Sequence, residues 1–193
     1  LVEDHAIPFM ALRLGFKGGA SLDRAGKRGS VNLMMALLEE GTDDLDARGF
    51  AREVDELAAS FTFDATGDSV SVSARMLSEN RDAAIALLKG AVAAPNFDQV
   101  AIDRVKGQVL SILQSDLKDP NEIAQTAFNK AAFGDHPYGS TLSGTAVSIE
   151  SLTRKDIQNA HRDTMARDRV FVSAVGDITA EELGALMDTL LED

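Results

Sequence analysis

The side chains that could bind a metal or move protons are few and dispersed. The three histidines, His5, His136 and His161, lie far apart in the sequence, and none forms a pair at helical spacing. We expect His136 to bond to the backbone of its loop and His161 to lie on an exposed helix face. A metal site built from all three histidines is the alternative.

Other catalytic motifs are absent from the sequence. There is no cysteine, and hence neither a thiolate nucleophile nor a disulfide. No serine stands in a G-x-S-x-G turn, and there is no G-x-G-x-x-G motif or Walker lysine. We interpret the acidic pairs Glu39-Glu40 and Asp43-Asp44 as a solvated helix end and a polar loop, with acid–base chemistry or calcium binding as the alternative.

The charge balance argues against two classes of partner. With 19 Lys and Arg against 31 Asp and Glu, the formal net charge is −12, whereas nucleic-acid binding needs a basic surface that neutralises phosphates. An anionic membrane surface is disfavoured for the same reason, and no apolar run has the length of a transmembrane helix. At 193 residues, 45% of them hydrophobic, the chain has the size and composition of one globular domain.

A helix is predicted over residues 29–42, and it organises the rest of the interpretation. Apolar residues recur in it every three or four positions, at Val31, Met34, Met35 and Leu38. Gly41 supplies its C-terminal stop. We interpret the Met34-Met35 pair as core filling, with an adaptable binding surface as the alternative.

Period-two alternation on both sides of Gly67-Asp68 predicts a β-hairpin over residues 61–73. Strands are predicted over 7–16 and, as a buried strand, over 169–175. Helices are predicted over 45–60, 79–94, 98–117, 122–133 and 179–191, with another beginning at Thr153. Ile112 is expected to face inward from the long helix. Few strands with a hairpin among them favour an α+β fold, in which helices pack on one face of a largely antiparallel sheet in a two-layer sandwich.

Short motifs occur in a fixed order along nearly the whole chain. They are L-V-E-D at 1–4, K-G-G-A-S at 17–21, G-S-V-N-L-M-M-A-L-L-E-E-G-T at 29–42, L-S-E-N at 77–80, P-N-F at 95–97, F-G-D-H-P-Y-G at 133–139, G-T at 144–145 and V-G-D-I at 175–178. In this order they resemble the insulinase/pitrilysin family of zinc peptidases, whose zinc helix reads G-L-A-H-F-L-E-H-M-L-F-K-G-T. The resemblance implies a single insulinase-like domain over residues 1–193.

The resemblance also implies that the metal site of this domain is degenerate. The two zinc-ligand histidines of the family's His-x-x-Glu-His motif match Asn32 and Ala36, and its general-base glutamate matches Met35. The third ligand, a glutamate on the long helix, matches Ile112. A catalytic zinc site needs three protein ligands, so we expect no catalytic residue, metal or other cofactor in this domain.

By the same resemblance, the domain helps to form a peptide-binding chamber and supports a catalytic insulinase-type subunit that carries the zinc. A core-type structural subunit and a hydrolase with an unrecognised site are the alternatives. A subunit of that family normally holds two such domains, so the resemblance implies the N-terminal half of a longer subunit. The sequence begins at Leu1 without an initiator methionine, and we therefore expect a fragment. We expect a bacterial periplasmic location, with the cytoplasm as the alternative.

The strand over residues 61–66 is the expected peptide contact, because the family's corresponding strand borders the zinc cleft and pairs with extended peptide. Its residues are Phe61, Thr62, Phe63, Asp64, Ala65 and Thr66. An exposed strand edge offers unpaired backbone groups to which many sequences can bond. The alternative is an internal strand with both edges occupied.

Overall fold

The computed structural model describes residues 1–42 and 44–191, so Asp43 of the pair Asp43-Asp44 lies outside the described residues. The described residues form a five-stranded sheet in the order β1-β5-β2-β4-β3. The strands are β1 (Val2–Glu3), β2 (Phe9–Lys17), β3 (Ser60–Ala65), β4 (Ser69–Leu77) and β5 (Val170–Gly176). Only β1 and β5 pair in parallel, so the predicted, largely antiparallel sheet is confirmed.

One face of the sheet is buried, and this follows from the period-two pattern of its central strands. The side chains of β2 and β4 that point to this face are Met10, Leu12, Leu14, Phe16, Val70, Val72, Ala74 and Met76, each at most 2% exposed. Arg13 and Arg75, which point to the opposite face, are exposed. The sandwich is therefore two-layered, as expected.

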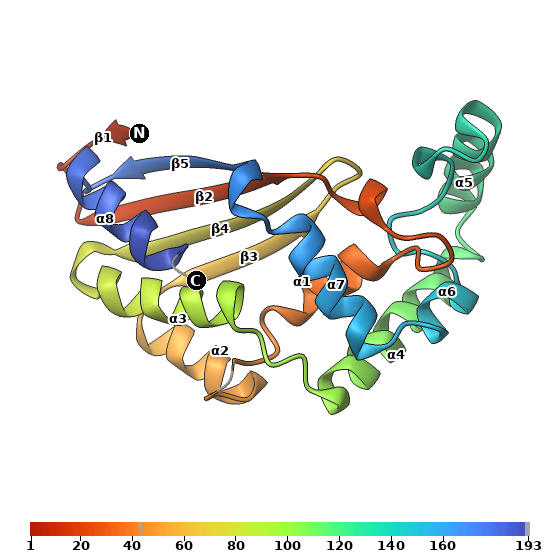
Figure 1. Cartoon of the computed structure of the whole chain (residues 1–193), viewed down its shortest axis with the longest axis horizontal. Coiled ribbons are helices and arrows are strands. Elements are labelled where there is room, and N and C mark those ends of the chain that lie inside the picture. Colours follow the sequence, from red (N-terminus) through yellow and green to blue (C-terminus); the bar gives the residue numbers. More distant parts are fainter. Residues whose placement is uncertain (43, 192–193) are drawn as a thin grey trace.

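Helices supply the second layer (Figure 1). They are α1 (Ser30–Leu37), α2 (Ala47–Glu56), α3 (Arg81–Ala93), α4 (Gln99–Asp116), α5 (Pro120–Phe133), α6 (Ala146–Glu150), α7 (Arg154–Thr164) and α8 (Ala180–Leu190). In Figure 1, α2, α3 and α8 run along the sheet, while α1, α4, α6 and α7 gather towards one end of it. No described helix meets the length and apolarity required to cross a membrane.

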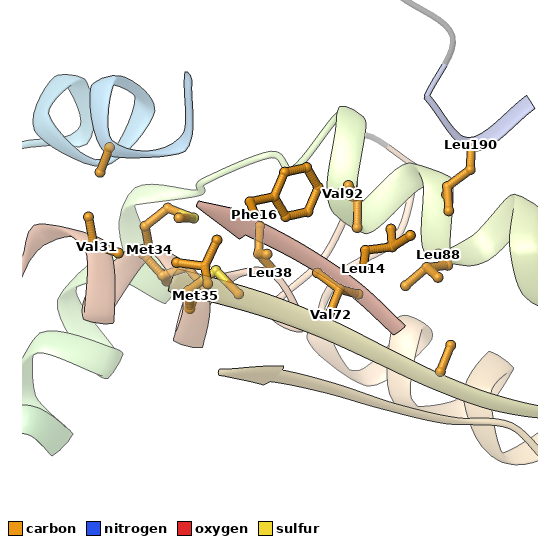
Figure 2. Packing of buried hydrophobic residues seen from close by; sticks show 14 of the residues in the cluster. Leu14, Phe16, Val31, Met34, Met35, Leu38, Val72, Leu88, Val92 and Leu190 are labelled. Atoms are coloured by element: carbon orange, nitrogen blue, oxygen red, sulfur yellow. The ribbon is translucent and has the colours of Figure 1, made fainter. Parts of the chain in front are cut away.

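The core joins α1 to the sheet. Figure 2 shows Met34 and Met35 of α1 close to Phe16 of β2. Both methionines are at most 1% exposed, which supports their interpretation as core filling. Met35 also contributes to the wall of a pocket described below, so its packing fixes one side of that pocket.

Three predictions about the helices and strands differ from the structure. The predicted helix over 29–42 is too long, because α1 ends at Leu37 and Gly41 (φ 133°) instead lies in a bridge to Asp46. Strand β5 is not a buried strand, because alternate side chains such as Phe171 (59% exposed) point away from the helices. Ile112 does not face inward from α4 but is 56% exposed. The predicted hairpin, with its turn at Gly67-Asp68, is confirmed.

The N-terminus of α1 is held by Asp23, which lies six positions before the N-cap of the helix. Gly29, the N-cap of α1, has φ 95° and no side chain to cap the helix. The Asp23 carboxylate instead accepts hydrogen bonds from the N–H groups of Gly29 (2.8 Å) and Val31 (2.9 Å) and from the Ser30 hydroxyl (2.6 Å). Arg28 pairs with the same carboxylate, whose side chain is only 3% exposed. Asp23 therefore fixes the position of α1.

We expect Asp23→Ala to lower the free energy of unfolding by about 3 kcal/mol, because it leaves helix N–H groups and a largely buried guanidinium without their anion. Asp46→Ala is the matched control, since exposed Asp46 caps α2 through one hydrogen bond to Gly49 N–H, and it should cost about 1 kcal/mol. Urea denaturation of both variants measures the difference. Equal losses would show that Asp23 is an ordinary cap.

Candidate functional site

Three of the four positions predicted as a degenerate zinc site lie together on one face of α1. Asn32, Met35 and Ala36 stand at i, i+3 and i+4, which places their side chains side by side on the helix. Asn32 and Ala36 are half-buried, whereas Met35 is only 1% exposed. This face of α1 looks towards β3 rather than into the centre of the core.

A pocket of about 350 Å³ separates this face from β3. Its lining consists of Asn32, Met35, Ala36 and Glu39 on the helix side and of Phe61, Thr62, Phe63, Asp64 and Ala65 on the strand side. The structure thus brings together the helix positions and the strand that the sequence singled out separately. Thr66, the last residue of the predicted contact, lies just after β3 and outside the described lining.

Ile112 is separate from this pocket. It lies on α4, which packs against α1, but its side chain is 56% exposed and does not belong to the described lining. Whether Ile112 matches the family's third zinc ligand stays a prediction.

Strand β3 lies at the edge of the sheet and pairs, among the described strands, with β4 alone. The N–H of Thr66 donates to the carbonyl of Ser69 at 2.8 Å, just beyond the β3–β4 register that places Asp64 opposite Ser71. Bonded and non-bonded residues alternate in an antiparallel pair, so the backbone groups of Ser60, Thr62 and Asp64 also point to β4.

The intervening residues of β3, Phe61, Phe63 and Ala65, therefore direct their N–H and C=O groups to the open edge of the sheet. No described strand occupies that edge. Among the described strands β3 is thus an edge strand and not an internal one, while its contact with peptide stays a prediction.

Glu39 is the acidic side chain on the helix side of the pocket, whereas the pairing of Asp64 with Ser71 turns the Asp64 side chain to the opposite face of the sheet. The lining includes Glu39 and Asp64 and, in the described part of the chain, no Lys or Arg. Burial and the charge of Glu40 raise the pKa of the Glu39 carboxyl. Glu40 itself pairs with Arg104, and its side chain is only 12% exposed, so Glu40 does not belong to a solvated helix end as the sequence suggested. Glu39 was missed as a site residue, although its position three residues after Ala36 continues the same helical face.

None of the three histidines is among the described residues of the lining. His136 Nδ1 accepts the Tyr138 N–H at 3.2 Å, as predicted. His5 contacts the Asp177 carboxylate at 2.7 Å, and this hydrogen bond raises the His5 pKa. The exposed position expected for His161 is wrong: burial lowers its pKa, and its Nε2 lies 2.7 Å from the carbonyl of Val92. Across residues 1–42 and 44–191, no three His, Asp or Glu side chains form a group that could hold a metal ion.

Comparison with known proteins decides the family. The model of the insulinase family (peptidase family M16) matches residues 1–146 of this chain. The chain belongs to this family. The resemblance to the insulinase family that the sequence motifs indicated is thereby confirmed. The M16 fold is confirmed by the structural comparison in the next paragraph.

The relatives within the M16 family include proteins described as inactive. The chain is 29% identical over 180 residues to the non-peptidase homolog YmxG of Helicobacter pylori, covering 93% of this chain and 42% of that protein. The crystal structure of a peptidase M16 inactive domain from Pseudomonas fluorescens matches 98% of this chain and 46% of its own with a TM-score of 0.94 at 29% identity. These two similarities fit an inactive M16 domain.

The M16 relatives also include a subunit of a processing enzyme. The chain is 22% identical over 165 residues to a probable mitochondrial-processing peptidase subunit beta of Arabidopsis thaliana, covering 86% of this chain and 31% of that protein. The chain thus spans less than half the length of each of these three relatives.

Proposed function

We propose that this chain is a non-catalytic M16 domain that binds extended peptide along β3 and supports a separate subunit of the family that carries the zinc. The observation that carries the proposal is the open edge of β3 beside a pocket whose helix wall bears Asn32, Met35 and Ala36. An extended peptide could pair with the open edge and place a side chain in the pocket, but the described lining lacks the ligand set of a zinc peptidase.

The residues at the proposed zinc positions do not fit a zinc ion. Zinc in proteins is held by His nitrogen, Cys sulfur or carboxylate oxygen. Ala36 and Ile112 have no donor atom, the Asn32 amide is a poor substitute for imidazole, and Met35 cannot act as a general base. We therefore assign zinc chemistry to the partner and propose no catalytic step in this domain.

Peptide binding is supported by the backbone geometry of β3. Phe61, Phe63 and Ala65 present their N–H and C=O groups in the manner of an unpaired strand. An extended peptide that adds to this edge gains main-chain hydrogen bonds irrespective of its sequence, while the adjoining pocket receives a side chain. The domain would thus hold substrate for the partner without cutting it.

A partner subunit is supported by the apolar surface of α5. Six of its apolar side chains, all exposed, occupy one half of the helix, whereas Phe133 at its end contacts Tyr138 instead. The six are Ile123, Ala124, Ala127, Phe128, Ala131 and Ala132. No residue of α5 is buried, and the helix stands away from the sheet in Figure 1. We propose that the zinc-bearing subunit covers this face, and that the chain is the N-terminal half of a longer subunit. The bacterial periplasmic location stays a prediction.

We expect co-expression with a subunit that carries an intact His-x-x-Glu-His helix to yield a complex with higher peptidase activity than that subunit alone. Ile123→Gln with Phe128→Gln should abolish the complex while changing the free energy of unfolding by less than about 0.5 kcal/mol, because both side chains are exposed. Size-exclusion chromatography and peptide cleavage measure the two effects.

Gln125→Ala, on the polar half of α5, is the matched control and should leave the complex intact. A double variant that still assembles would remove α5 from the interface. A complex that forms without any gain in activity would favour the structural-subunit interpretation instead.

A further inference from the structure

Helix α5 stands away from the sheet (Figure 1), and the element against which it mainly packs is the short helix η3 (Pro137–Gly139). The ring of Phe133, at the end of α5, meets the ring of Tyr138 in η3 edge to face, with 5.5 Å between the ring centres. Gly139 lies so close to the end of α5 that a β-carbon on it would stand 2.2 Å from the Gly134 carbonyl oxygen. Helix α5 and η3 therefore form one structural unit.

Tyr138 attaches this unit to the turn between β3 and β4. Its hydroxyl donates a hydrogen bond to the Asp68 carboxylate, and its ring lies over Gly67, where a β-carbon would come within 3.1 Å of Tyr138 Cε1. Beside this contact, a cavity of about 470 Å³ separates the turn from the α5 residues Asn129 and Phe133. Tyr138 thus connects α5 to the turn at a place where the helix itself leaves a gap.

A second attachment comes from Arg28, which precedes α1. Its guanidinium donates to the carbonyl oxygens of Pro137 at 3.0 Å and of Ser140 at 3.2 Å, so it holds the backbone of η3. One attachment would leave the unit of α5 and η3 free to rotate about it, whereas two attachments fix its direction. Tyr138 is the attachment that reaches the strand proposed to bind peptide.

The turn that Tyr138 contacts is itself held firmly. The carbonyl oxygens of Thr66, Gly67 and Asp68 accept three hydrogen bonds, of 2.7 to 2.9 Å, from N–H groups of the segment that follows β2. Ala65, the last residue of β3 that directs its N–H to the open edge, comes directly before this turn. A side chain anchored to the turn is therefore anchored to the end of the open edge.

We propose that Tyr138 is a positioning residue that holds α5 in a fixed orientation relative to the open edge of β3. The inference rests on the proposed function, in which the zinc-bearing subunit covers α5 and peptide lies along β3. A fixed α5 then places the zinc of the partner at a set position against the bound peptide. Alignment of this kind matters, because a displacement of about 1 Å can slow a reaction by about 100-fold.

The first test follows the contact in the free chain. Tyr138 is the one tyrosine of a chain without tryptophan, so a titration followed by ultraviolet absorbance reports its hydroxyl alone. The hydrogen bond to Asp68 raises the pKa of Tyr138. We expect Asp68→Ala to lower this pKa, and the control Ser21→Ala, which removes another hydroxyl 3.4 Å from the same carboxylate, to leave it raised. Equal pKa values in the parent and Asp68→Ala would overturn the proposal.

The second test measures the orientation of α5. Because the sequence has no cysteine, Gln125→Cys on α5 and Thr62→Cys on β3, both at exposed positions, can carry a pair of spin labels. We expect a narrow distance distribution in the labelled parent and a broad one when Tyr138→Ala is added. Asp68→Asn keeps an acceptor for the hydroxyl and should restore most of the narrow distribution that Asp68→Ala loses. A distribution that Tyr138→Ala leaves equally narrow would show that Arg28 alone positions α5.

The third test concerns cleavage of a fluorogenic peptide by the complex with a subunit that carries an intact His-x-x-Glu-His helix. We expect Tyr138→Ala to lower kcat by about tenfold and to preserve assembly and KM, since it changes neither the apolar face of α5 nor the edge of β3. Thermal unfolding first confirms that the variant folds. An unchanged kcat would overturn the positioning role and leave the proposed function intact. A parent chain that captures no peptide and adds no activity would overturn the proposed function and the positioning role together.

Discussion

We expect the purified domain to emerge from dialysis without stoichiometric zinc and to cleave no peptide. The physical reason lies in the donor atoms: among Asn32, Met35, Ala36 and Ile112 there is no imidazole and no carboxylate, and catalytic zinc requires three such ligands. Metal analysis and a peptidase assay, each with and without a chelator, measure the outcome. One equivalent of zinc that survives dialysis, with activity that the chelator removes, would contradict it.

Restoring the four family residues tests whether the scaffold can still hold a metal. We expect Asn32→His, Met35→Glu, Ala36→His and Ile112→Glu together to confer zinc binding. Zinc at about 100 times its dissociation constant should then stabilise this variant by about 2.7 kcal/mol, seen as a rise in Tm. Without zinc the variant should be less stable than the parent, because Met35→Glu places a carboxylate at a position that is 1% exposed.

The matched control is Ile112→Glu alone, which changes an exposed side chain and should neither bind zinc nor alter stability. We expect the fourfold variant to recover little peptidase activity, since the groups that orient zinc ligands were also free to change. If zinc fails to raise the Tm of the fourfold variant, then either Ile112 is not the match of the third ligand or α4 cannot bring position 112 to α1.

The sequence predicted a structural element correctly where a single local pattern of apolar residues determines that element. Alternation around Gly67-Asp68 was sufficient for the hairpin, and the spacing of Val31, Met34 and Met35 was sufficient for a core-facing helix. The site was harder to predict, because it depends on which segments meet. The sequence identified Asn32 and Phe61 in separate segments, but only the packing of α1 against the edge of the sheet shows that they line one pocket.

The errors have a common physical origin. Ile112 and Phe171 are apolar residues on elements that pack by one side only, so apolar character alone predicted burial where tertiary structure leaves them exposed. His161 is the opposite case, a polar residue on a helix that is drawn into a contact with Phe97, whose ring lies 5.7 Å away. Asp23 was missed because it caps α1 from a segment outside the helix, where the sequence carries no local capping signal.

Replacing a residue of β3 by proline removes one backbone N–H and can therefore test whether peptide pairs with this strand. The orientation of the N–H groups along β3 decides which residue should be replaced. From the sequence, proline at Thr62 or Thr66 is expected to weaken peptide capture, provided that the N–H faces the peptide. In the structure neither N–H faces the open edge. The N–H of Thr66 donates to the carbonyl of Ser69, and the alternation along β3 points the N–H of Thr62 towards β4 as well. The N–H groups on the open edge belong to Phe61, Phe63 and Ala65, and Ala65 is the one that can be changed without removing an aromatic ring.

We therefore expect Ala65→Pro to weaken capture of an extended peptide by the assembled complex by about tenfold or more. The change removes a hydrogen-bond donor, and it places the proline ring where the peptide backbone would approach. It should affect stability little, since proline is tolerated on an edge strand where the missing N–H faces outward. Thr66→Pro should show the reverse pattern, a loss of about 1–3 kcal/mol in the free energy of unfolding through the broken bond to Ser69. Anisotropy of a labelled peptide and thermal unfolding separate the two variants, and an Ala65→Pro protein that folds and captures peptide as tightly as the parent would exclude the edge of β3 as the binding site.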